Sequence, residues 1–197
     1  MDGMEKTEST KPKDLKDLII AIKGAGDIAS GIAWSLFQAH MCNLFMLEVP
    51  EPLAVRRTVS FCEALLDGRI EIEGVEAVKA EKSEEIQQAW HHGEIPVLMD
   101  PEWSNIERIK PDVVVDATMA KCNLGTCLRD APLVIGLAPG FVAGGDVHMV
   151  IETNRGHNLG RIISSGEAEP DTGVPGEIAG YKDERVIPPS PSTRSMR

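Results

Sequence analysis

A glycine-rich turn is the strongest chemical signal in the sequence. Residues 24–29 read Gly-Ala-Gly-Asp-Ile-Ala, a G-x-G-x-x-A pattern placed where a short apolar run gives way to helical spacing. In such a pattern the first glycine allows a tight turn, the second lets a phosphate approach the backbone, and the small third residue lets the helix pack on the strand. The amides of the helix N-terminus then face the anion. We therefore expect a pyrophosphate site at Gly24, Gly26 and Ala29.

Two carboxylates accompany this turn. Glu48 lies 22 residues after Gly26, at the end of the second predicted strand, where a dinucleotide fold places the acid that binds a ribose hydroxyl. Its charge disfavours a 2′-phosphate, although Arg56 and Arg57 follow closely. Asp27 lies at the helix N-terminus, where it would cap the helix and compete with a phosphate for the same amides. The alternative is a plain tight turn with a solvated Glu48.

Three basic side chains are candidates for holding the distal, anionic part of a ligand. Lys121 follows the valine-rich predicted strand 112–118, and ligands of open α/β sheets bind beyond the carboxyl ends of the strands. Arg155 and His157 lie in a later predicted loop, where they would also meet an anion. For each of the three, the alternative is an ordinary surface position.

An alternating segment carries the candidates for proton transfer and metal binding. Residues 146–153 predict a strand whose apolar face, which goes to the core, holds Val147, Met149 and Ile151. The other face would hold Asp146, His148, Val150 and Glu152. Asp146 and His148 are close enough there to share a proton or a weakly held metal ion. The alternative is a sheet face open to water. Lys121 and His148 are the candidate catalytic residues.

Two cysteines lie close together in the loop after Lys121. Cys122 and Cys127 are five residues apart, and exposed thiolates there would carry a sulfur or selenium atom as nucleophiles. Nothing in the sequence indicates a lowered pKa at either thiol. The alternative is a pair of ordinary free cysteines.

Composition and charge exclude several partners. The 197-residue chain has 20 Lys and Arg against 31 Asp and Glu, a formal charge of −11 that would repel nucleic acid and anionic membranes. Its apolar runs fall short of the ~20 residues that span a bilayer, and residues 1–17 lack the apolar core of a signal peptide. The four cysteines form no C-x-x-C pair, which favours free thiols in a reducing compartment. We expect a cytoplasmic protein; the sequence is also compatible with a homo-oligomer.

The elements that must position these residues alternate between strand and helix. Predicted strands cover residues 18–23, 43–48, 96–100, 112–118, 133–137, 146–153 and 161–164, and a hairpin covers 69–80. Predicted helices cover residues 28–37, Val55 to Leu66, and a segment from Ser83, as N-cap, to Gly93. This alternation predicts a doubly wound, mainly parallel, Rossmann-like sheet with an irregular, β-rich C-terminal third. We expect a flexible leader (1–17), one domain (18–187) and a flexible tail (188–197).

Several blocks of the sequence together resemble the selenium-dependent molybdenum hydroxylase system protein family. They are residues 24–31, 52–61, 131–137, 139–141, 146–148, 150–160 and 172–176, and the resemblance covers residues 18–187. This family is similar to the Rossmann part of xanthine dehydrogenase accessory proteins, which help load the molybdenum cofactor. The resemblance implies a role in maturing a selenium-containing molybdenum hydroxylase, with that enzyme as partner. It implies no known reaction.

Three functions stay open on the sequence. The first is an accessory protein whose Gly24–Ala29 crevice binds NAD(P) or the dinucleotide form of the molybdenum cofactor, with Glu48 on a ribose. Its distal cations would be Lys121, Arg155 and His157. The second is an NAD-dependent oxidoreductase in which His148 moves a proton. The third is a non-catalytic docking protein with a vestigial nucleotide fold. The fold alone does not choose among them, because this architecture hosts many functions.

Overall fold

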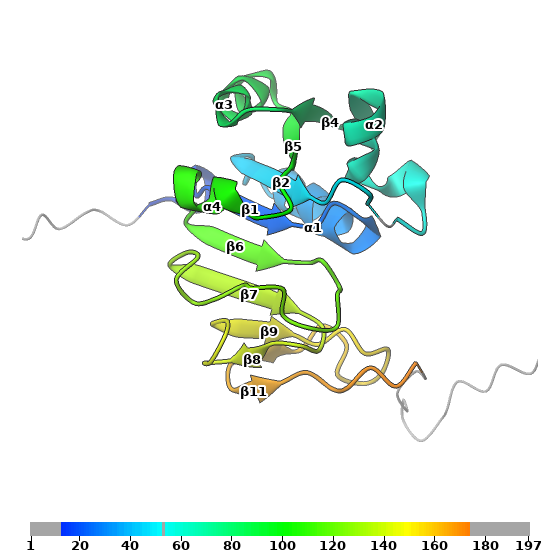
Figure 1. The fold of residues 1–197 in the computed structure, drawn as a ribbon, viewed down its shortest axis with the longest axis vertical. Coiled ribbons are helices and arrows are strands. Elements are labelled where there is room, and N and C mark those ends of the chain that lie inside the picture. Colours follow the sequence, from blue (N-terminus) through cyan, green and yellow to red (C-terminus); the bar gives the residue numbers. More distant parts are fainter. Residues whose placement is uncertain (1–12, 53, 174–197) are drawn as a thin grey trace, which may run out of the picture.

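A nine-stranded mixed sheet forms the centre of the fold (Figure 1). The computed structural model describes residues 13–52 and 54–173. The strands lie in the order β10-β9-β7-β6-β1-β2-β5-β4-β3, and the neighbours from β9 to β4 are parallel. Leaving out the antiparallel β3–β4 hairpin and the antiparallel edge strand β10, the order of the remaining six is the 3-2-1-4-5-6 of a dinucleotide-binding sheet. The predicted Rossmann-like α/β fold is confirmed.

The bounds of the elements agree with most of the predicted ones. The strands of the large sheet are β1 (Ile20–Lys23), β2 (Leu44–Glu48), β3 (Arg69–Ile72), β4 (Val75–Ala80), β5 (Ile95–Met99), β6 (Val113–Asp116), β7 (Leu133–Leu137), β9 (Met149–Ile151) and β10 (Ile162–Ile163). A separate antiparallel pair consists of β8 (Val142–Ala143) and β11 (Gly166–Glu167). The helices are α1 (Asp27–Gln38), α2 (Ala64–Asp67), α3 (Ser83–His92) and α4 (Ser104–Ile109), with 3-10 turns η1 (Leu15–Asp17), η2 (Arg57–Val59) and η3 (Phe61–Glu63).

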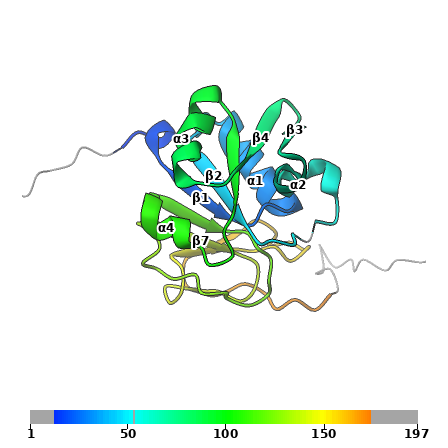
Figure 2. The ribbon, with the colours of Figure 1, turned by 45° about the horizontal axis from the view of Figure 1, so that its top comes forward.

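The sheet separates two apolar cores. On one face Ile20 and Ile22 of β1 belong to the core that includes α1 and α2, whereas Ala21 points to the core that includes α3 and α4. Figure 2 shows these two helix pairs on opposite sides of the sheet. The small β8–β11 pair lies beside the part of the sheet that β7 and β9 form (Figure 1). Because both faces of the central strands are covered, their sequences are near-continuous apolar runs.

The long helix predicted from Val55 to Leu66 is wrong. The chain there makes two 3-10 turns and then the single-turn helix α2. Two of its amides bond outside the segment: the amide of Phe61 donates to Ser30 Oγ of α1 (2.8 Å), and the amide of Cys62 donates to the carbonyl of Ala25 in the glycine-rich turn (2.9 Å). These contacts satisfy amides that a continuous helix would have bonded internally.

Helix α3 begins at Ser83, the residue that was predicted to be its N-cap. Its N-cap is Lys82, and Ser83 makes no side-chain cap and is already helical. The carboxylate of Glu85 reaches back to the amide of Glu81 (2.8 Å) and satisfies a donor ahead of the helix. The predicted end at Gly93 is confirmed, and this glycine adopts the left-handed conformation with φ +73°.

The predicted wet face of the segment 146–153 is also wrong. The strand itself is only Met149–Ile151, and Val150 is fully buried while Glu152 is only 2% exposed. Val150 shares a core with Ala143 and Ala168, which belong to or adjoin the β8–β11 pair. Val147 was predicted on the face of Ile151, but it shares the core of Val150, whereas Ile151 packs on the other core. A second layer covers the face that was expected to meet water.

The described part of the predicted leader contacts the domain. Lys13 Nζ lies 2.7 Å from the carboxylate of Asp112, and residues 15–17 form the turn η1. The predictions for residues 1–12 and for the tail 188–197 lie outside the described residues. None of the described helices has the length and apolar character needed to cross a membrane.

Candidate functional site

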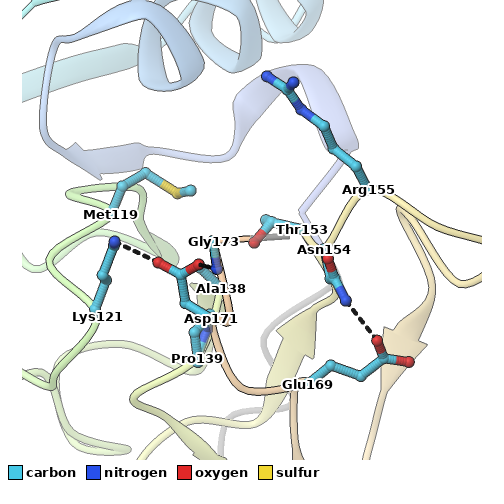
Figure 3. A pocket seen from close by; sticks show the side chains of 10 residues that line it. All are labelled: Met119, Lys121, Ala138, Pro139, Thr153, Asn154, Arg155, Glu169, Asp171 and Gly173. Atoms are coloured by element: carbon cyan, nitrogen blue, oxygen red, sulfur yellow. Dashed lines mark hydrogen bonds and ion pairs between the residues drawn. The ribbon is translucent and has the colours of Figure 1, made fainter. Parts of the chain in front are cut away.

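One pocket lies at the edge of the sheet where the parallel strands end (Figure 3). It has a volume of about 260 Å³. Its lining comes from the segments that follow β6, β7, β9 and β11: Met119, Lys121, Ala138, Pro139, Thr153, Asn154, Arg155, Glu169, Asp171 and Gly173. Ligands of open α/β sheets bind beyond the carboxyl ends of the strands, so the pocket is where this fold is expected to hold one.

The glycine-rich turn adjoins this pocket through the segment after β6. Gly24 has φ +95°, and a Cβ built on it would lie 3.1 Å from the carbonyl oxygen of Ala117 and 3.3 Å from Cα of Thr118. Only a glycine fits there. Met119, the next residue, lines the pocket. The turn therefore packs at the β1–β6 boundary, where the strand order reverses, against a segment that continues into the wall of the pocket.

Glu48 is used inside the protein rather than left free for a ribose. Its two carboxylate oxygens accept hydrogen bonds from the amides of Ala25 (2.6 Å) and Val49 (2.7 Å). The residue is only 8% exposed, and this burial raises its pKa although the two amides act to lower it. The carboxylate thus holds the glycine-rich turn against the end of β2. The predicted ribose contact would have to share these oxygens.

Asp27 does not cap helix α1, in contrast to the expectation. Its carboxylate instead binds Arg56, at the backbone amide (3.2 Å) and at Nε (2.7 Å), and the hydroxyl of Ser60 (2.9 Å). Burial acts to raise the pKa of Asp27, but these hydrogen bonds lower it. The N-cap is Gly26, and α1 has no side-chain cap. Because the Asp27 carboxylate binds Arg56 and Ser60, it does not occupy the amides of the first turn of α1, which a phosphate would need.

Lys121 and Arg155 both line the pocket, from different loops. Lys121 forms an ion pair with Asp171. Arg155, by contrast, has no partner among the described residues and extends away from that pair (Figure 3). His157 is exposed and is absent from the described lining of this pocket. Two of the three predicted distal cations therefore lie at one site.

Backbone strain is concentrated in the pocket wall. Met119, Lys121 and Ala138 have φ values of +58°, +61° and +72°, a region that side-chain-bearing residues rarely adopt. They are three of the seven such residues in the described chain. Gly140 supports the arrangement, because a Cβ on it would lie 2.8 Å from the backbone of Cys122. Strained residues of this kind cluster at ligand sites, where the surrounding structure holds them in place.

A buried polar network positions the loop that carries Lys121, and the sequence analysis missed it. Lys23 Nζ, on a side chain 1% exposed, donates to Thr126 Oγ1 (2.7 Å) and pairs with Asp130 (3.0 Å). The hydroxyl of Thr126 donates in turn to Asp116 (2.5 Å), whose other oxygen accepts from the hydroxyl and the amide of Thr118. The only sequence signal was a charged residue at the end of each of two apolar runs, at Lys23 and Asp116.

Glu152 joins two walls of the pocket. Its buried carboxylate accepts hydrogen bonds from the amides of Asn154 and Glu169, both at 2.7 Å. The Glu169 carboxylate then accepts from the side-chain amides of Asn154 (2.6 Å) and Asn158 (3.0 Å). The segment after β9 is thereby fixed to the segment after β11.

The remaining predicted site residues lie elsewhere. His148 precedes β9, so it is at the amino ends of the strands, and its Nδ1 accepts the amide of Val134 (2.9 Å). Asp146 binds the amide of Val142 (3.0 Å). The two side chains thus have separate partners. Within the described residues no group of three or more His, Cys, Asp or Glu side chains could hold a metal ion.

The four cysteines are all free thiols. Cys122 is exposed on the loop after Lys121. Cys127 is half-buried, with its sulfur 3.1 Å from a carboxylate oxygen of Asp130. The nucleophile hypothesis for Cys122 and Cys127 stays a prediction.

Comparison with known proteins finds one close similarity. The chain is 50% identical over 169 residues to an Escherichia coli (strain K12) protein named "Uncharacterized protein YqeB". The match covers 86% of this chain but 31% of YqeB, so the chain spans about a third of the length of that relative. No family model matches the chain. No solved structure matches it either.

Proposed function

We propose that this protein binds a nucleotide-bearing, anionic cofactor in the crevice between the glycine-rich turn and the Lys121–Arg155 pocket. In this proposal it serves in the cytoplasm as an accessory protein for maturing a selenium-dependent molybdenum hydroxylase. The observation that carries the binding function is the meeting of Lys121 and Arg155 in a pocket that adjoins Gly24 through Ala117 and Thr118. The maturation role rests on the resemblance of sequence blocks described above.

The contacts indicate which part of the ligand each side of the crevice would bind. A pyrophosphate would meet the uncapped amides at the start of α1, where the helix dipole favours negative charge. The more distal anionic part would meet Lys121 and Arg155. NAD(P) and the dinucleotide form of the molybdenum cofactor present the same pyrophosphate handle, so both remain candidates.

The docking alternative has one observation in its favour. The amide of Ala25, inside the glycine-rich turn, is already bonded to Glu48 at 2.6 Å. A turn whose amide already donates a hydrogen bond within the protein offers fewer donors to a phosphate. The oxidoreductase alternative has less support, because His148 lies at the opposite edge of the sheet from the pocket.

A thermal-shift panel tests the binding function. The ligands are NAD, NADH, NADP, cytidine nucleotides and extracted molybdenum cofactor. Ligand near 100 times Kd should stabilise the fold by about 2.7 kcal/mol, a rise in Tm of roughly 5–10 °C. Gly26 has φ −72° and ψ −171°, an extended conformation that valine adopts readily, so Gly26→Val should fold and yet block phosphate approach.

The matched control is Gly31→Val in the same helix. Gly31 is exposed, and a Cβ on it would meet nothing within 4 Å, so this variant should keep the full ligand shift. A shift lost in Gly26→Val and retained in Gly31→Val supports the crevice. A well-folded wild type that responds to none of the ligands contradicts cofactor binding and favours the docking role.

A further inference from the structure

The Lys121–Asp171 ion pair places a carboxylate of the protein in its own anion pocket. Asp171 lies 50 residues after Lys121 in the chain, and both line the 260 Å³ pocket together with the unpaired Arg155. A carboxylate and a phosphate oxygen use the same donors of a lysine. The group that Lys121 would offer to a ligand is thus already engaged by Asp171.

We infer that Asp171 is an internal competitor for the anion site of Lys121, and that a phosphate-bearing ligand binds by displacing it. This inference rests on the proposed function, because it concerns the same pocket. It adds the identity of the group that the ligand must replace. It also assigns Arg155 as the cation that is open to the ligand before displacement.

The geometry indicates which partner moves. Lys121 lies on a backbone held at φ +61°, next to Cys122, which packs against Gly140. Asp171 lies on an exposed segment, residues 169–173, which the bond from the Glu169 amide to Glu152 holds at its start. The backbone that carries Lys121 is therefore held in place, and Asp171 is the partner that swings away.

The Lys121–Asp171 ion pair is weak enough for a ligand to displace the carboxylate. The side chains of Lys121 and Asp171 are 68% and 35% exposed. Ion pairs this accessible to solvent stabilise a fold only slightly, so a ligand can break this one at little cost. The remaining hydrogen bond of Asp171 is local, from the amide of Gly173 at 2.9 Å.

Calorimetric titration with inorganic pyrophosphate at constant ionic strength tests the inference. Asp171→Asn removes the competing charge but keeps a side-chain oxygen for the amide of Gly173. Freeing the fraction of Lys121 that is now paired should tighten pyrophosphate binding roughly three- to fivefold. The charge-matched control is Asp17→Asn, an exposed carboxylate ahead of the amino end of β1, and it should bind like the wild type. Lys121→Met should lose most of the binding in either background.

The outcomes separate this inference from the function on which it rests. Equal affinity in the wild type and Asp171→Asn, with binding lost in Lys121→Met, overturns the competitor role and leaves the pocket as the anion site. Undiminished binding in Lys121→Met overturns the inference because another group then holds the anion. No binding in any folded variant overturns the proposed function and the inference together.

Discussion

Lys23 and Asp116 face each other in the parallel pairing of β1 with β6, and both bind the hydroxyl of Thr126. Each residue is only 1% exposed. The ammonium is further compensated by Asp130 (3.0 Å) and lies 5.4 Å from the centre of the Trp103 ring. Buried charges are tolerated when they are paired and hydrogen-bonded in this way. The network fixes the loop that carries Lys121 to the centre of the sheet.

Removing the shared hydroxyl should destabilise the fold. Thr126→Val leaves Lys23 and Asp116 each short of a buried hydrogen-bond partner, and we expect a loss of about 1–3 kcal/mol in the free energy of unfolding. Urea unfolding measures it. Thr58→Val, at an exposed threonine of η2, is the matched control and should change stability by less than about 0.5 kcal/mol. Equal stability of the two variants would show that the network does not hold the loop.

Two glycine substitutions should have opposite effects. A Cβ on Gly136 would lie 2.6 Å from the ring of Phe141, so Gly136→Ala should destabilise the protein by about 1–3 kcal/mol. The same change at Gly31, exposed within α1, should stabilise it by about 0.5–1 kcal/mol. Urea unfolding compares the two. In a Phe141→Leu background the penalty at Gly136 should shrink; an unchanged penalty would place the clash elsewhere.

Asp100 should make stability depend on pH in the acid range. Burial alone would raise its pKa, but hydrogen bonds from the amides and side chains of Asn105 and Ser104 lower it below the ordinary 3.8. The folded state therefore holds the charged form more firmly than the unfolded state does. This contribution is present above pH 3.8 and is lost as the pH falls through the folded-state pKa.

Asp100→Asn tests this dependence. We expect it to cost about 1.5–3 kcal/mol at pH 7 and less at pH 3, which lies below the ordinary pKa of 3.8, so that the unfolded chain binds the proton and part of the contribution is lost. Urea unfolding at the two pH values gives the difference. Asp67→Asn, at an exposed carboxylate of α2, should be close to neutral at both. A constant difference between Asp100→Asn and the wild type across this range would contradict the assignment.

The cysteines should differ strongly in reactivity. Burial raises the pKa of Cys62 to about 11, and the nearby carboxylates of Glu48 and Glu63 add to the effect. At pH 8 this leaves on the order of one thousandth of that thiol as the reactive thiolate. Exposed Cys122 should therefore react first with iodoacetamide. Mass spectrometry of labelled peptides follows each site, and Cys62 should react only after denaturation in urea. Labelling of native Cys62 at the rate of Cys122 would contradict its burial.

Local patterns in the sequence were sufficient for most of the fold. The apolar runs, the hairpin around Gly74 and the helix end at Gly93 depend on neighbours within a few residues, and the structure contains each of them. The helix predicted after Val55 is wrong because two amides of this segment donate to distant acceptors, Ser30 in α1 and Ala25 in the turn before it, rather than within a helix. Such a competition between local and distant hydrogen bonds is invisible to periodicity.

The sequence by itself determined the chemical types at the site: the glycines of the turn, the acid at the end of β2 and the cations in later loops. Only the tertiary structure decided which of them meet. Lys121 and Arg155 share a pocket because the carboxyl ends of β6 and β9 lie at one edge of the sheet, whereas His148 is at the other edge. Lys23 and Thr126 are 103 residues apart in the chain, and only the folded sheet brings them together. A group's role depends on its neighbours in space, and the strand order supplies them.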